Sequence, residues 1–66
     1  MPLIRVSMFP GRTDDQKKAL VEELTAAFVR AAGGKREGVW VMIDEVPPEH
    51  WGVGGALSSA PGPTDS

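Results

Sequence analysis

The sequence of 66 residues contains no cysteine and only one histidine, His50. Without thiols the chain has neither disulfides nor a cysteine nucleophile, and a structural zinc site would have to rely on carboxylates, which is unusual for such sites. No run of about 18 apolar residues and no secretory signal pattern occurs. We therefore expect no metal, no cofactor, no membrane partner and a cytoplasmic location.

An excess of charge of one sign is also missing. The chain carries seven Lys and Arg against nine Asp and Glu, for a net charge of −2, and the basic residues are scattered. Scattered basic residues do not form the positively charged patch that binds the phosphates of nucleic acid, so we expect no nucleic-acid partner. At this length a single core rarely supplies more than about 3 to 5 kcal/mol, and without disulfides or metal the expected support is subunit association.

The hydrophobic pattern predicts a strand at residues 2–9, a helix at 14–32 and a second strand at 39–46. Thr13 and Gln16 match a capping box, in which both side chains satisfy free amides at the helix start. The helix, about 28 Å long, is close to the strands in length, which suits a crossover connection. The predicted fold is of the α/β class, a single right-handed β-α-β unit with parallel strands.

The carboxyl-terminal part of the chain differs in composition. Residues 52–57 are glycine-rich and predict a short C-terminal hairpin, whereas residues 60–66 lack apolar anchors and predict a flexible tail after one domain at residues 1–59. Both faces of the second strand are apolar, yet one helix covers only one face of a two-stranded sheet. We therefore predict a homo-oligomer in which other subunits complete the sheet.

Two residues carry the candidate chemistry. Removal of Met1 would leave Pro2 with a secondary amine that can take up a proton or attack a carbonyl, and about 10% of an ordinary α-amino group is free base at pH 7. Arg12 offers a guanidinium whose fork can hold a carboxylate in two parallel hydrogen bonds. Taken singly, each also has a plainer explanation, because many chains begin Met-Pro and many loop arginines are merely solvated.

Four segments taken together have a recognisable order and spacing. They are Pro2, the Pro-Gly-Arg-Thr-Asp-Asp-Gln-Lys stretch at 10–17, Val-Trp-Val-Met-Ile-Asp-Glu at 39–45, and His-Trp-Gly-Val-Gly-Gly at 50–55. This pattern resembles the 4-oxalocrotonate tautomerase family of the tautomerase superfamily, and only the tail lies outside it. The resemblance implies β-α-β subunits whose dimers associate into a hexamer, a trimer of dimers, or sometimes remain dimers. The implied activity is enol–keto or 1,3-proton transfer on an unsaturated 2-hydroxy/2-oxo acid.

The resemblance also implies roles for particular residues. By position, Pro2 would be the general base and Arg12 would bind a carboxylate of the small-molecule substrate. Backbone amides near Phe9 and Gly38 would position the substrate, and Trp51 would be the aromatic wall of the pocket. Met8, Phe9 and the tryptophans would surround Pro2 with apolar groups that favour its free-base form, with Arg12 as the nearby cation.

Trp40 is the one departure from the family pattern, because it stands where the family usually has a second arginine. Loss of an electrostatic stabiliser of developing charge is worth about 3 kcal/mol, so we expect a flatter, more apolar pocket for a monoacid with an aryl or alkenyl group. Arg5 and Arg36 are the cations that could compensate. Two alternatives stay open: a hydratase, dehalogenase or decarboxylase of unsaturated acids using the same proline, and a non-catalytic subunit of a hetero-oligomer.

Overall fold

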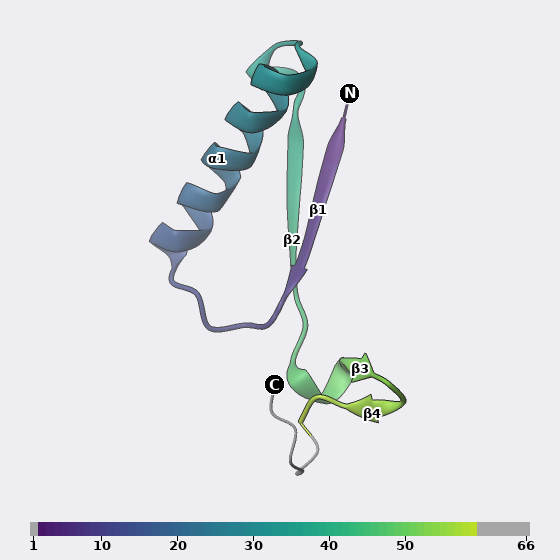
Figure 1. The fold of residues 1–66 in the computed structure, drawn as a ribbon. Coiled ribbons are helices and arrows are strands. Elements are labelled where there is room, and N and C mark those ends of the chain that lie inside the picture. Colours follow the sequence, from purple (N-terminus) through teal and green to yellow (C-terminus); the bar gives the residue numbers. More distant parts are fainter. Residues whose placement is uncertain (1, 60–66) are drawn as a thin grey trace.

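The computed structural model describes residues 2–59, so Met1 and the predicted tail at 60–66 lie outside the described residues. The elements are β1 (Leu3–Met8), α1 (Asp14–Ala32), the one-turn 3-10 helix η1 (Arg36–Gly38), β2 (Trp40–Glu45), the 3-10 helix η2 (Pro48–His50), β3 (Gly52–Val53) and β4 (Ala56–Leu57). This order confirms the predicted β-α-β unit with a short C-terminal hairpin (Figure 1).

Strands β1 and β2 run parallel, with Leu3 opposite Trp40 at one end and Met8 opposite Glu45 at the other. Each strand is one residue shorter at either end than the predicted 2–9 and 39–46. Two hydrogen bonds nevertheless continue the ladder past the strands: the Trp40 amide donates to the Pro2 carbonyl (2.9 Å), and the Val46 amide donates to the Met8 carbonyl (2.8 Å). The backbone of Pro2 is therefore held against the start of β2.

The start of α1 is fixed by the predicted capping box. The Gln16 amide donates to the Thr13 hydroxyl (3.1 Å), while the Thr13 amide donates to the Gln16 side-chain oxygen (2.8 Å). In the loop before it, Gly11 has φ of 128°, a conformation that side-chain-bearing residues rarely adopt. The helix ends before Gly33, as predicted. The loop that carries Arg12 runs from the end of β1 to the capped start of α1.

Helix α1 lies along one face of the sheet (Figure 1), where alternate strand residues are half-buried: Ile4, Val6, Met8, Val41 and Ile43. No element among residues 2–59 covers the opposite face, where Leu3, Trp40 and Met42 keep 49%, 56% and 44% of their surface exposed. Among residues 2–59 no hydrophobic side chain is fully buried. A single chain therefore presents an apolar sheet face of the kind that proteins usually cover.

No helix within the described part of the chain has the length and apolar character required to cross a membrane.

Candidate active site

Three of the six predicted site residues lie together where the two parallel strands begin. The Pro2 carbonyl accepts the Trp40 amide hydrogen, and Gly38 closes the turn of η1 just before β2 by donating its amide hydrogen to the Lys35 carbonyl (3.0 Å). The Trp40 indole lies on the open face of the sheet, directly across from Leu3. This cluster of Pro2, Gly38 and Trp40 is called the proline end.

The other three predicted residues lie where the strands finish. Phe9 follows β1 and packs edge-to-face on Trp51, with ring centroids 5.0 Å apart. The Trp51 indole nitrogen donates to the Val46 carbonyl (3.0 Å), which fixes the ring beneath the hairpin. Arg12 stands in the loop that leads from β1 to α1. This cluster of Phe9, Arg12 and Trp51 is called the arginine end.

The whole length of β1 separates the two ends (Figure 1). At about 3.3 Å per residue, the seven steps from Pro2 to Phe9 span about 23 Å. The expectation that Met8, Phe9, Trp51 and Arg12 surround Pro2 is therefore not met within one chain. A sequence pattern identifies residue types and spacing, but it does not say which chain supplies each residue to a site.

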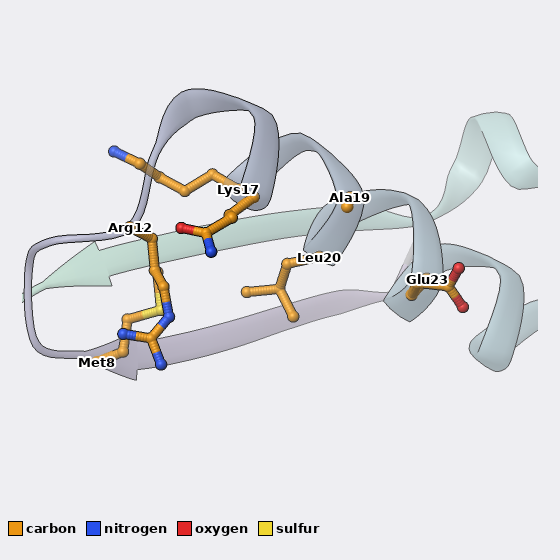
Figure 2. Close-up of a pocket in the computed structure, with 7 residues that line it drawn as sticks. Met8, Arg12, Lys17, Ala19, Leu20 and Glu23 are labelled. Carbon is orange, nitrogen blue, oxygen red and sulfur yellow. The ribbon is translucent and has the colours of Figure 1, made fainter.

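A cavity of about 280 Å³ opens beside Arg12. Figure 2 shows the guanidinium next to Met8, with Leu20 of α1 to its side in the direction of Glu23. The cavity is lined by Met8, Arg12, Gln16, Lys17, Ala19, Leu20 and Glu23. Of these, only Met8 and Arg12 had been linked to the site by sequence reasoning. The recurrence of Gln16, Ala19, Leu20 and Glu23 at three- and four-residue steps, one side of a helix, is the signal that could have found the rest.

Arg12 differs from two other cations of the chain in having no ion-pair partner within residues 2–59. The Lys17 ammonium lies 3.0 Å from the Glu45 carboxylate and 4.0 Å from that of Asp14. Figure 2 shows this ammonium pointing away from the Arg12 guanidinium. A carboxylate entering the cavity would therefore find one guanidinium without a carboxylate partner among residues 2–59, beside the apolar side chains of Met8, Ala19 and Leu20.

Arg5 and Arg36, the two candidates to compensate for Trp40, occupy different surroundings. Arg5 lies on the open face of the sheet and donates to Asp44 across the strands (2.8 Å), so its charge is already balanced. Arg36 starts η1 at the proline end and is exposed. Of the two, only Arg36 is placed near Pro2 without a carboxylate partner in the part of the chain that the structure describes.

Among residues 2–59, no group of three potential metal ligands gathers. His50 lies exposed in η2.

A β-α-β unit with a proline at one end of the sheet and an arginine pocket at the other matches a known class. The family model described as "Tautomerase enzyme" matches residues 2–60, and the chain belongs to this tautomerase family. The resemblance to 4-oxalocrotonate tautomerases is thereby confirmed, since solved structures of that type share both the fold and the sequence.

Individual relatives agree over nearly the whole chain. It is 52% identical over 60 residues to a "Probable tautomerase" of Ralstonia nicotianae, covering 91% of this chain and 86% of that one. It is 46% identical over 55 residues to 2-hydroxymuconate tautomerase of Pseudomonas putida, covering 83% and 87%. Among solved structures, TomN, a homologue from the tomaymycin biosynthetic pathway, is 45% identical with a TM-score of 0.83, covering 88% and 89%. A heterohexamer 4-oxalocrotonate tautomerase from Chloroflexus aurantiacus is 41% identical with a TM-score of 0.82, covering 89% and 95%.

Proposed function

We propose that this chain is an isomerase that transfers a proton within an unsaturated 2-hydroxy/2-oxo acid, converting an enol to its keto form. The observation that carries the proposal is the unpaired Arg12 guanidinium in an apolar cavity, in a chain of the tautomerase family. The guanidinium holds the substrate carboxylate through paired hydrogen bonds, and the conjugated part of the substrate lies against apolar walls. The name of the Pseudomonas putida relative, 2-hydroxymuconate tautomerase, supports the same reaction class.

The chemical step needs one base that later acts as an acid. With Met1 removed, the Pro2 nitrogen takes the proton of the enol hydroxyl, and the electron pair moves along the conjugated system to a carbon atom. The protonated amine then returns a proton to that carbon, which gives the ketone with no change of composition. Phe9 and Gly38 contribute backbone amides that position the substrate, while Trp40 and Trp51 contribute aromatic surface.

The separation of the two ends requires that a complete site draw on more than one chain. Because Pro2 precedes β1 and Arg12 follows it, at opposite ends of the strand, Pro2 of one subunit serves the Arg12 pocket of another. Two chains related by a twofold axis, with their strands antiparallel, bring opposite ends together. We propose a homo-oligomer, a hexamer built as a trimer of dimers, whose assembly also covers the open sheet face of Leu3, Trp40 and Met42.

Replacing Met42 with glutamate tests the assembly. The side chain is 44% exposed in the single chain, so a charge there costs little in an isolated subunit, but it would be buried without a partner in the assembled sheet. We expect Met42→Glu to sediment as a monomer or to fail to fold at micromolar concentration, whereas Met42→Leu assembles like the wild type. A wild-type chain that sediments as a folded monomer would contradict the oligomer.

Trp40 and the heterohexamer from Chloroflexus aurantiacus favour a second candidate, a non-catalytic subunit that requires a partner chain.

The experiment that separates the isomerase from the non-catalytic subunit follows the absorbance of two enols, phenylenolpyruvate and 2-hydroxymuconate, during ketonisation by the purified chain. Intact mass first establishes that Met1 has been removed. Turnover of either enol well above the buffer rate supports the isomerase. Turnover of neither contradicts it and favours the partner-dependent subunit or the hydratase, dehalogenase and decarboxylase reactions on unsaturated acids.

A further inference from the structure

The cavity beside Arg12 is lined by one carboxylate, Glu23, as well as by two cations, Arg12 and Lys17. Lys17 lines this cavity with Arg12, but its ammonium lies 3.0 Å from Glu45. Glu23 lines the same cavity at the end away from Arg12 (Figure 2), and none of the ion pairs among residues 2–59 includes it. Of the two cations that line the cavity, Lys17 is therefore held by a carboxylate outside the lining, whereas Arg12 has no carboxylate partner among residues 2–59.

We propose that this cavity is a monocarboxylate site, in which Glu45 and Glu23 set the specificity. The inference rests on the proposed role of Arg12 in binding a substrate carboxylate. Glu45 keeps the Lys17 ammonium turned away, and Glu23 places a like charge where the far end of a ligand would lie. The preferred ligand has one carboxylate for Arg12 and an uncharged, apolar remainder.

The walls of the cavity support this assignment. Apart from its charged side chains, the cavity is lined by Met8, Ala19 and Leu20, which cannot donate a hydrogen bond from their side chains, and by Gln16, whose side-chain oxygen accepts from the Thr13 amide. A second carboxylate in the cavity would give up its hydrogen bonds to water, would find only the Gln16 amide as an uncharged side-chain donor of the lining, and would face Glu23. An alkenyl or aryl group there gains apolar contact instead.

A matched pair of ligands that do not react measures the preference directly. Sorbate and trans,trans-muconate share a six-carbon diene skeleton, and sorbate has a methyl group where muconate has its second carboxylate. Isothermal titration calorimetry on the full-length, assembled protein gives the ratio of their dissociation constants. We expect sorbate to bind at least as tightly as muconate, although muconate has twice the charge.

Variants then assign the preference to named residues. Glu23→Gln and Glu45→Gln are each expected to shift the ratio towards muconate by about two- to fivefold, the range for partly screened charges. Glu22→Gln, next to Glu23 but outside the cavity, removes the same charge and serves as the matched control, with no shift expected. When Lys17→Met is added to Glu45→Gln, we expect the shift towards muconate to disappear, because the Lys17 ammonium released from Glu45 is the group that would bind the second carboxylate.

Either of two results would overturn the proposal: muconate binding tenfold tighter than sorbate in the wild type, or Glu22→Gln shifting the ratio as much as Glu23→Gln. Because Glu45→Gln also breaks the contact with Lys17, the fold of the Glu45→Gln variant is checked by circular dichroism. If that variant does not fold, the result with Glu23→Gln alone decides whether the proposal holds. Neither ligand has an enol, so binding is measured whether or not the chain is an isomerase. A loss of the proposed activity and a failure of the monocarboxylate preference are therefore separate outcomes.

Discussion

Blocking the Pro2 nitrogen is expected to lower kcat/KM for enol ketonisation by about 10²- to 10⁴-fold, the usual contribution of a positioned general base. Pro2→Leu achieves this because methionine is removed efficiently only before small residues, so Met1 stays and the nitrogen of residue 2 becomes an amide without basicity. Intact mass confirms the retained methionine, and ultraviolet absorbance with phenylenolpyruvate measures the rate.

Pro2→Ala is the control for that loss. Alanine is small enough for Met1 removal, so this variant exposes a primary amine without the ring that fixes its direction. We expect its rate to fall between those of the wild type and Pro2→Leu, with assembly unchanged by sedimentation. If Pro2→Leu retained wild-type turnover while assembled, the base would have to be another group, and the proposed mechanism would be wrong.

The second large effect is expected at Arg12. Charged hydrogen bonds contribute about 1.5 to 3 kcal/mol, so Arg12→Gln should raise KM by about ten- to a hundredfold. The effect on kcat is smaller, because the carboxylate is bound in the ground state and in the transition state alike. Steady-state kinetics at fixed ionic strength measures the changes in KM and in kcat separately.

Two further variants test whether Arg12 acts by geometry as well as charge. Arg12→Lys keeps the charge but loses the fork, and it should recover only part of the binding. Lys18→Gln removes one positive charge from an exposed helical position that does not line the cavity, and it should leave KM unchanged. An Arg12→Gln enzyme with wild-type KM would mean that the carboxylate binds elsewhere.

Local signals explain how much of the fold could be predicted from the sequence. The capping box of Thr13 and Gln16 and the stop at Gly33 act within a few residues, and both helix boundaries were predicted correctly. The strand ends were each placed one residue too far, because apolar side chains at Pro2, Phe9, Val39 and Val46 extend the pattern beyond the strands. The β-α-β order followed from these elements.

The site could be predicted only in part. The family pattern identified Pro2 and Arg12 as a pair, but their separation along β1 depends on the third dimension and on the number of chains. The contact of Lys17 with Glu45 joins residues from α1 and β2 that no local pattern links. The same is true of Arg5 and Asp44, whose pairing removes Arg5 as a substitute for the arginine that Trp40 replaces.

The open face of the sheet shows why the single chain is an incomplete unit. The second strand is predicted from its sequence to be apolar on both faces, and within residues 2–59 only the face beneath α1 is covered. Assembly would supply both the missing cover and the missing half of each site. Stability and activity are therefore expected to depend on the same contacts between subunits.

The shared site is tested most directly by mixing two defective variants. Pro2→Leu and Arg12→Gln chains are unfolded together in equal amounts and refolded, so that mixed oligomers form; each variant alone and the wild type are treated in the same way. If Pro2 and Arg12 act from different subunits, about a quarter of the sites in a random mixture receive both intact residues, and about a quarter of the wild-type activity returns. Activity no higher than the mean of the two separate variants would contradict a site built across the subunit interface.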